Sequence, residues 1–345
     1  MSLETAENLI RLAFSEDPLS LHFAFQGGEP TLRGLDFYRD FADLVDRYNT
    51  ANTPVEFSMQ TNGFVIDEAW TEFFKAHNFL MGLSLDGTVR THNINRLGPE
   101  NEGTFRRVWE VVEMFQKVGV EFNILTVVNH QVAQAIDKIY PFYMKKGLYY
   151  QQYIPCLDPF EEERGLHDYS LKPEDYANFL LRLFDMWYED VMAGRFVYIR
   201  FFENLVGMLL GYPPEACGMV GICQPQLVIE ADGSVYPCDF YVLDDLRIGN
   251  INHNTLAEIE DNRSKTHFIG QSAPVDSACQ NCAYFPLCRG GCRRDREPRQ
   301  GEQMSLNYYC SAFKTFYSYA IPKLQNVVAK ITKQGKTSLL PIERT

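Results

Sequence analysis

The sequence predicts an α/β fold in which a parallel sheet is followed by a cysteine-rich region. Over the first 165 residues, short apolar runs alternate with helical patterns, which is typical of βαβ units. Eight of the nine cysteines then lie between Cys217 and Cys310, in a turn-rich stretch from about residue 211 to 312. The length of 345 residues is enough for about two domains.

Five apolar runs are predicted to be strands. They are LHFAF (21–25), VEFSMQ (55–60), FLMGLSL (79–85), VEFNILTVV (120–128) and YYQQYIP (149–155), with helical patterns between them at, for example, 34–49 and 104–119. Each strand is followed by polar or glycine-containing residues, in turn QGGEP, QTNG, SLDG, VVNH and CLDP. Because the carboxyl ends of parallel strands share one edge of a sheet, we expect these residues to form the binding face.

Two longer helices are predicted beyond the strands. The first runs from Ser170 to about Gly194, with Ser170 as its N-cap ahead of Pro173. The second contains FKTFYSYAIPKL (313–324), and the chain then ends in a polar segment that we expect to fray.

Composition and charge exclude several classes of protein. A hydrophobic fraction of 46% and a charged fraction of 22% are those of a globular protein rather than a disordered or coiled-coil chain. The net charge of −13, without a basic run, argues against nucleic-acid binding. No apolar stretch approaches the roughly 20 residues of a membrane span, and the acidic N-terminus is unlike a signal peptide. We therefore expect a cytoplasmic protein without a membrane or nucleic-acid partner.

The cysteine spacing indicates metal binding. An odd number of cysteines in a chain without an export signal favours reduced thiols over disulfides. The spacing runs Cys217-x5-Cys223-x9-Gly233-x4-Cys238, then Cys279-x2-Cys282-x5-Cys288-x3-Cys292-x17-Cys310. Eight thiolates make two four-thiolate sites, which suit either zinc or iron–sulfur clusters. Cys156 is left over, and we expect it to be a small buried apolar residue.

This order of cysteines resembles the SPASM domain, which carries two auxiliary [4Fe–4S] clusters in peptide-modifying radical SAM enzymes. The resemblance implies that one cluster is bound by Cys217, Cys223, Cys238 and Cys292. It implies that the other is bound by Cys279, Cys282, Cys288 and Cys310. FAFQGGEPTL also resembles the GGEP motif of radical SAM enzymes, and SLDG followed by Arg96 matches the next part of their binding site.

The segments FAFQGGEPTL, SMQTNG, VEFNIL, CLDP, DGSVYPCDFYVLD, CRGGCRR and NYYC together resemble the anaerobic sulfatase-maturating enzymes over nearly the whole chain. These enzymes oxidise a cysteine or serine of a sulfatase to Cα-formylglycine. The resemblance implies a partial (β/α)6 TIM-like radical SAM barrel lacking its first strand at 1–165 and linking helices at 166–210. It implies a SPASM domain at 211–320 and a tail at 321–345.

The resemblance further implies that Gly28, Ser84, Arg96 and Leu157 bind S-adenosylmethionine. A glycine lets the main chain approach the ligand closely, and a planar guanidinium suits its carboxylate. From the residues alone, Arg96 could equally form a surface ion pair and Ser84 could cap a loop.

Gln26 and Asp239 are implied to act on the substrate. By the resemblance, Gln26 points toward the peptide, and Asp239 removes the proton of the target thiol or hydroxyl. We expect a carboxylate beside the ligand Cys238 to be partly buried and to feel nearby negative charge, which both raise a pKa. From the residues alone, Asp239 could be a turn or capping residue.

The family's Cys-x3-Cys-x2-Cys motif is absent from the printed sequence, where no cysteine precedes Cys156. We expect that a first strand and loop are missing ahead of Met1 and that the chain alone is inactive, because sulfonium cleavage needs that cluster. The implied partners are an unfolded sulfatase or its Cys- or Ser-containing peptide and a low-potential electron donor. Two alternatives stay open: a radical SAM/SPASM enzyme that forms a thioether or epimer, and a non-enzymatic zinc protein.

Overall fold

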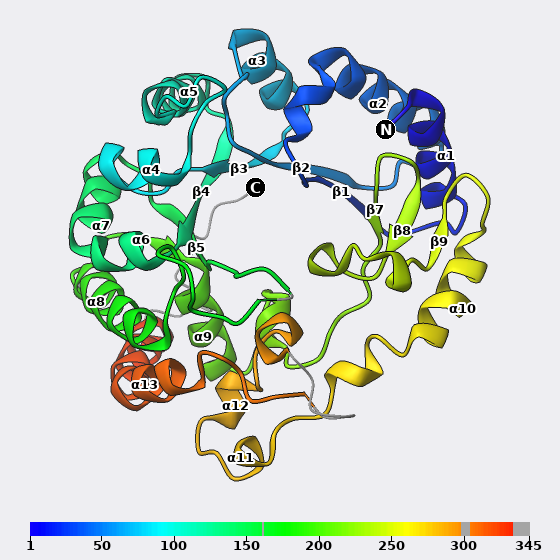
Figure 1. The fold of residues 1–345 in the computed structure, drawn as a ribbon. Coiled ribbons are helices and arrows are strands. Elements are labelled where there is room, and N and C mark those ends of the chain that lie inside the picture. The colour runs from blue at the N-terminus through cyan, green and yellow to red at the C-terminus, as the bar shows by residue number, and fades with distance from the viewer. Residues whose placement is uncertain (161, 298–303, 334–345) are drawn as a thin grey trace. The chain divides into compact units, whose positions relative to one another are not determined.

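The computed structural model describes residues 1–160, 162–297 and 304–333 (Figure 1). Contacts between residues divide the chain into two units, each formed from separate segments. The first unit contains residues 1–83, 109–122 and 224–271. The second contains residues 84–108, 123–223 and the described residues from 272 onward.

The parallel strands of the first unit are covered by amphipathic helices. Its strands are β1 (Leu21–Phe25), β2 (Val55–Thr61) and β3 (Leu80–Ser84), and its helices include α1 (Leu3–Phe14), α2 (Leu35–Tyr48), α3 (Glu68–Ala76) and most of α5 (Phe105–Val118). The register pairs Leu21 with Val55 and Met59 with Met81. Side chains of Ser2 and Asp67 cap α1 and α3, as short polar N-caps do.

A small antiparallel sheet completes the first unit. It consists of β7 (Val228–Ile229), β8 (Ser234–Tyr236) and β9 (Gly249–Asn250), followed by α10 (Leu256–Thr266). Apolar side chains of the sheet and of α10 form one cluster, against which α1 packs: Val235, Ile248, Ile251, Ile259, Leu9 and Leu12. The expectation of a turn-rich stretch missed α10. The signal was present, since Thr255 and Glu258 form a capping box.

The second unit contains the later strands and most of the helices. Its elements include β4 (Glu121–Val128), β5 (Tyr150–Pro155), β6 (Tyr198–Ile199), α4 (Val89–Asn95), α6 (His130–Gln134), α7 (Ile136–Lys145), α8 (Pro173–Met192), α9 (Arg200–Leu209), α11 (Ser277–Gln280), α12 (Phe285–Cys288) and α13 (Cys310–Lys333). Short 3-10 helices in the described residues are η1 (Pro30–Arg33), η2 (Cys217–Met219), η3 (Asp239–Tyr241), η4 (Asp244–Leu246), η5 (Gly270–Ser272) and η6 (Arg293–Arg296). Strands β1 to β6 follow one another in chain order in a six-stranded sheet, and α13 packs on α8 and α9.

The α/β fold with a parallel sheet is confirmed, and the five predicted strands are present with ends shifted by no more than one residue. The predicted N-cap is wrong: Lys172 precedes α8, and Ser170 instead donates to Asp158. The second predicted helix begins at Cys310 and crosses the boundary expected at residue 320. The segment expected to fray lies outside the described residues.

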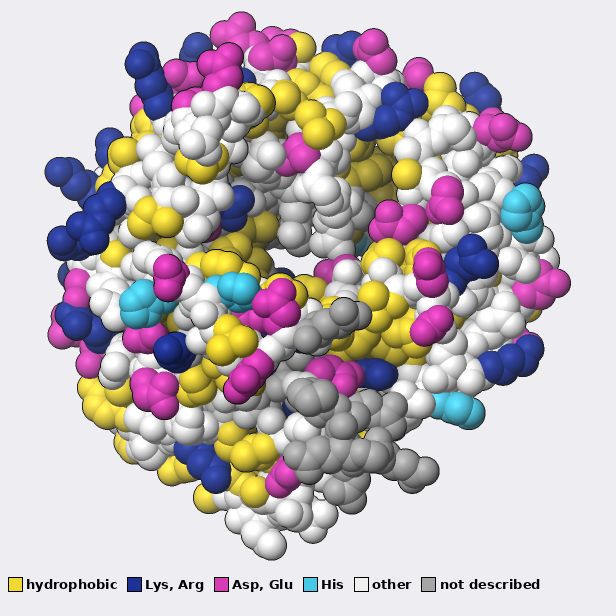
Figure 2. Space-filling model, viewed as in Figure 1, with side chains coloured by type: hydrophobic (Ala, Val, Ile, Leu, Met, Phe, Trp, Pro, Cys, Tyr) yellow, Lys and Arg dark blue, Asp and Glu magenta, His cyan; other side chains and the backbone are white. Residues whose placement is uncertain are grey.

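Charged side chains of both signs are interspersed over the face shown in Figure 2. Among the described residues, no helix is both long enough and apolar enough to cross a membrane.

Candidate functional site

The residues that follow β1 form a turn that requires glycine. Gly27 and Gly28 have φ angles of +83° and +52°, and a Cβ at either position would have no heavy atom within 4 Å. The Glu29 carboxylate fixes this turn to the end of β2. It accepts hydrogen bonds from Thr61 Oγ1 at 2.8 Å and from Asn62 N at 2.7 Å. The main chain at Gly28 is therefore both fixed in conformation and open to an approaching ligand.

Gln26 and Asp239, which are 213 positions apart, are hydrogen-bonded in the first unit. Gln26 Nε2 donates to Asp239 Oδ2 at 3.3 Å, and Cys238 Sγ donates to Asp239 Oδ1 at 3.4 Å. The predicted substrate contact, the predicted base and a predicted cluster ligand thus lie together. The expected partial burial of Asp239 is wrong, because Asp239 begins η3 with an exposed side chain while Tyr241 is the residue of that turn that is buried.

In the second unit, an ion pair holds Arg96 in place. Arg96 Nε donates to Asp86 Oδ2 at 2.5 Å and Arg96 Nη2 donates to Asp86 Oδ1 at 3.3 Å. Asp86, only 4% exposed, also accepts from Val127 N at 2.8 Å. A bidentate pair of this kind fixes the plane of a guanidinium. Ser84 is half-buried, and within the described ranges its hydroxyl has no hydrogen-bond partner.

The turn after β3 is supported by a neutral histidine, which the sequence analysis missed. His92 is fully buried, its Nδ1 accepts from Asp86 N at 3.2 Å, and its Nε2 lies 3.0 Å from Thr104 Oγ1. Burial lowers the pKa of His92 to about 4, so the ring is uncharged near neutral pH. The available signal in the sequence was Asp86, the aspartate of SLDG, because a buried carboxylate needs hydrogen-bond donors around it.

Leu157 and the unassigned Cys156 follow β5. Both are half-buried, and the next residue, Asp158, is only 5% exposed. Burial raises the pKa of the Cys156 thiol to about 11, so that thiol is neutral.

Four of the predicted cluster ligands surround one cavity in the second unit. They are Cys279, Cys282, Cys288 and Cys310, which come from α11, α12, the turn between them and the start of α13. Tyr284, Phe285, Phe313 and Tyr317 complete the wall. Burial raises the pKa of Cys279, Cys288 and Cys310, that of Cys288 to about 11. Four soft ligands around a cavity with aromatic walls suit an iron–sulfur cluster. Zinc takes the same kind of donor, but among the described residues no three His, Cys, Asp or Glu side chains are placed to hold a single metal ion.

The other four predicted ligands are divided between the units. Cys217, Cys223 and Cys292 belong to the second unit, and Cys238 belongs to the first. Burial, then the charge of Asp295 and to a smaller extent the nearby Cys223 and Cys217, raise the pKa of Cys292 to about 12. Burial raises the pKa of Cys223, and the positive charges of the buried Arg293 and Arg296 partly offset this rise. These two cations therefore favour the thiolate form there. Three of the four predicted ligands are therefore near one another.

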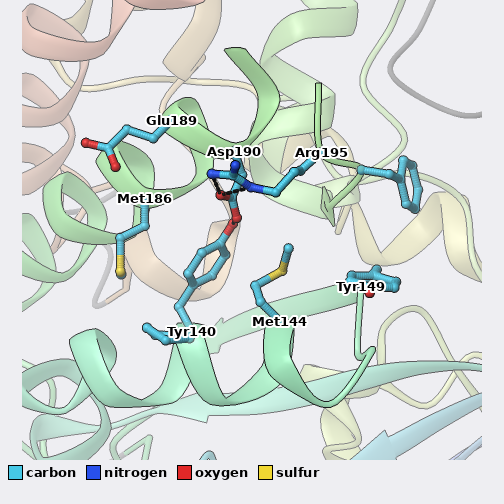
Figure 3. Close-up of a pocket in the computed structure, with 9 residues that line it drawn as sticks. Tyr140, Met144, Tyr149, Met186, Glu189, Asp190 and Arg195 are labelled. Carbon is cyan, nitrogen blue, oxygen red and sulfur yellow. Dashed lines mark hydrogen bonds and ion pairs between the residues drawn. The ribbon is translucent and has the colours of Figure 1, made fainter. Parts of the chain in front are cut away.

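A cavity of about 650 Å³ lies elsewhere in the second unit (Figure 3). Tyr140 and Met144 of α7, Asp190 of α8 and Arg195 line it, and Asp190 accepts hydrogen bonds from Tyr140 Oη and Arg195 Nε. Tyr149 lines it too and precedes β5, whereas the predicted site residues follow their strands. The cavity is therefore at the opposite ends of the strands and is not the catalytic site.

Two family models match the chain. Residues 1–142 match the radical SAM superfamily, and residues 217–283 match SPASM, an iron–sulfur cluster-binding domain. The second match covers the small sheet and five of the eight clustered cysteines. Cys288, Cys292 and Cys310 lie beyond it.

Individual proteins match over almost the full length. A cysteine-type anaerobic sulfatase-maturating enzyme from Clostridium novyi is 47% identical, over 95% of this chain and 87% of that protein. A serine-type anaerobic sulfatase-maturating enzyme from Bacteroides thetaiotaomicron is 30% identical, over 93% of this chain and 83% of its own. A solved structure, native anSMEcpe with bound AdoMet and Cp18Cys peptide, matches with a TM-score of 0.94 at 44% identity, covering 96% of this chain and 92% of that one.

Proposed function

The chain belongs to the anaerobic sulfatase-maturating enzymes of the radical SAM superfamily, and we propose that the residue it oxidises is a cysteine. Its reaction is the one of this family, the conversion of a cysteine or serine in a sulfatase to Cα-formylglycine. The preference for cysteine is supported by the identities, 47% to a cysteine-type enzyme against 30% to a serine-type enzyme.

We propose that Asp239 is the general base and that Gln26 orients the peptide. The observation that carries this is the hydrogen bond between their side chains at 3.3 Å. Asp239 is exposed and can reach a substrate thiol, whose proton it accepts at a carboxylate oxygen. The Gln26 amide can turn from Asp239 to a peptide carbonyl, because both groups accept the same donor.

Bound S-adenosylmethionine and [4Fe–4S] clusters supply the hydrogen abstraction and take up the electron. We propose that Gly28, in the first unit, contributes its main chain to S-adenosylmethionine. In the second unit, Ser84 and Leu157 contribute side chains, and Arg96, fixed by Asp86, contributes a cation for the carboxylate.

The cluster ligands are proposed as two sets. One consists of Cys279, Cys282, Cys288 and Cys310, supported by their common cavity. The other consists of Cys217, Cys223, Cys238 and Cys292, supported by the proximity of the three in the second unit.

We propose an unfolded sulfatase segment as the protein partner and a low-potential protein as the electron donor. Support for a peptide comes from the solved relative, which holds one. The target residue must reach the strand ends, which a folded sulfatase would prevent.

The test is an anaerobic assay with dithionite, S-adenosylmethionine and a sulfatase peptide containing cysteine or serine, using protein that carries the family's Cys-x3-Cys-x2-Cys segment. We expect formylglycine from the cysteine peptide, and a loss of at least about 100-fold in rate for Asp239→Asn. Asp244→Asn, at an exposed carboxylate of η4, is the matched control and keeps the rate. Retained activity in Asp239→Asn would refute the base, and faster turnover of the serine peptide would refute the substrate preference.

A further inference from the structure

The loop that follows β5, described at residues 156–160 and 162–170, is bound to the segments around Cys292 and Cys310. All of them lie in the second unit. Arg294 Nη2 donates to the main-chain oxygen of Asp158 at 2.6 Å, and the Arg294 guanidinium lies 3.8 Å from the centre of the Phe160 ring. Arg294 is only 5% exposed. The buried Arg294 guanidinium thus makes a charged hydrogen bond and a ring contact to this loop.

A second arginine makes the same connection in the opposite direction. Arg164, in the loop, donates from Nη2 to Asp295 Oδ1 at 3.0 Å, and the two side chains are 11% and 17% exposed. The Arg164 guanidinium also lies 4.6 Å from the centre of the Tyr308 ring. Arg294 and Arg164 therefore form two buried links between the loop and the cysteine-bearing segment.

Hydrogen bonds inside the loop connect its beginning to its end. The Asp158 carboxylate accepts from Gly165 N at 2.9 Å and from Ser170 Oγ at 2.5 Å. Leu157 precedes Asp158, so the position of Leu157 follows that of the linked loop. Removing one partner would leave buried polar groups unsatisfied, which is costly.

On the other side, the links stand next to predicted cluster ligands. Arg294 N donates to Cys292 Sγ at 3.4 Å, and Asp295 N donates to Cys292 O at 3.1 Å. Tyr309 precedes Cys310, and its hydroxyl donates to Cys156 O at 3.3 Å. Any constraint on Cys292 or Cys310 is transmitted over one to three residues to the loop.

We propose that Arg294 and Arg164 are positioning residues, through which cluster loading at Cys292 and Cys310 orders the loop that carries Leu157. The inference rests on the proposed ligands and on the proposed role of Leu157 at S-adenosylmethionine. Coupling between binding equilibria is reciprocal, so S-adenosylmethionine must in turn raise the affinity of the chain for the cluster iron.

The experiment is hydrogen–deuterium exchange of the chain before and after anaerobic reconstitution with ferrous iron, sulfide and a thiol. We expect loading to slow exchange in residues 156–170 by about 5-fold or more. Arg294→Met and Arg164→Met lose this protection at equal iron content. Arg263→Met is the matched control, because Arg263 is similarly buried but lies in α10 and pairs with Glu260 of the same helix. Compared per iron bound, it keeps the protection.

A second measurement uses S-adenosylmethionine as the probe and the equilibrium distribution of iron between the chain and a competing chelator as the readout. The ligand shifts this distribution toward the unchanged chain and has no effect in Arg294→Met. Where Arg294→Met takes up no iron, Arg164→Lys is measured, which keeps the charge and loses the planar contact. The proposal would be overturned if hydrogen exchange in the loop were the same before and after cluster loading. It would also be overturned if the arginine variants kept the full protection against exchange. Because no turnover is required, this result is independent of whether Asp239 is the base.

Discussion

The strands of the first unit and the cysteine-bearing segments of the second are stabilised in different ways. The Phe79 ring, directly before β3, stacks on Phe25 of β1 and Phe57 of β2 with ring centres 6.2 and 5.1 Å apart, beside a parallel ladder of strands. The segment around Cys292 instead has short turns and buried arginines that donate to main-chain oxygens.

This contrast indicates which part of the molecule depends on bound metal for its stability. Apolar burial alone stabilises the sheet, since it removes large aromatic surfaces from water without leaving polar groups unpaired. The cysteine-bearing segments bury charges and neutral thiols, which contribute little until a ligand is bound.

The largest effect is expected from Cys288→Ala. Without one of four ligands, the cavity of Cys279, Cys282 and Cys310 loses its metal, so roughly half of the iron and sulfide bound by the clustered cysteines disappears. Exchange in residues 279–310 rises while that of β1 to β3 is unchanged. Cys156→Ser is the control and keeps all iron. Tightly bound zinc without sulfide in the unchanged chain would contradict the cluster assignment.

Phe79→Ala should be the most damaging change to the sheet. Phe79 is 2% exposed and contacts rings of β1, β2 and α3, so its removal leaves a cavity costing about 3–5 kcal/mol of unfolding free energy. Chemical denaturation measures this loss. Leu19→Ala, at a side chain that is 95% exposed, should change stability by less than about 0.5 kcal/mol. An equal loss in both variants would show that this apolar core does not stabilise the sheet.

The buried His92 makes stability depend on pH. Its pKa of about 4 in the fold is below the 6.5 of an unfolded histidine, so only the unfolded chain takes up the proton between these values. Stability is fully present above pH 6.5 and falls as the pH drops toward 4, by about 3 kcal/mol at most. His92→Asn should flatten this part of the curve of unfolding free energy against pH. His253→Asn, at an exposed ring, should leave it as it is.

The smallest effect is expected for Arg182→Ala. Arg182 pairs with Asp137, but the two side chains are 61% and 42% exposed, so solvent screens the pair. We expect a loss of less than about 1 kcal/mol in thermal or chemical unfolding, reduced further by salt. A loss as large as that from Phe79→Ala would mean that surface charge, rather than apolar burial, dominates outside the cysteine-bearing segments.

Much of the fold could be predicted because its signals are local. The first five strands are runs of apolar residues with turn residues at their ends, and all five were predicted. The two-residue strand β6 and the three short strands of the small sheet have no such run and were missed. Two kinds of error arose where the deciding partner is distant. Ser170 fits an N-cap locally, but its hydroxyl donates to Asp158. Asp239 follows a ligand in sequence, yet η3 leaves it exposed.

The sequence by itself determined the strand and helix pattern, the inventory of eight clustered thiols and the family, because periodicity and covalent spacing are written along the chain. Only the tertiary structure decided that Gln26 meets Asp239, that Asp86 fixes Arg96, and that Arg294 and Arg164 hold the loop of Leu157. The contact of Gln26 with the exposed Asp239 depends on which distant segments meet, and the arginine contacts depend on which charged groups become buried together. The free-energy cost of burying a charged group is decided only when distant segments pack, and no local sequence pattern encodes it.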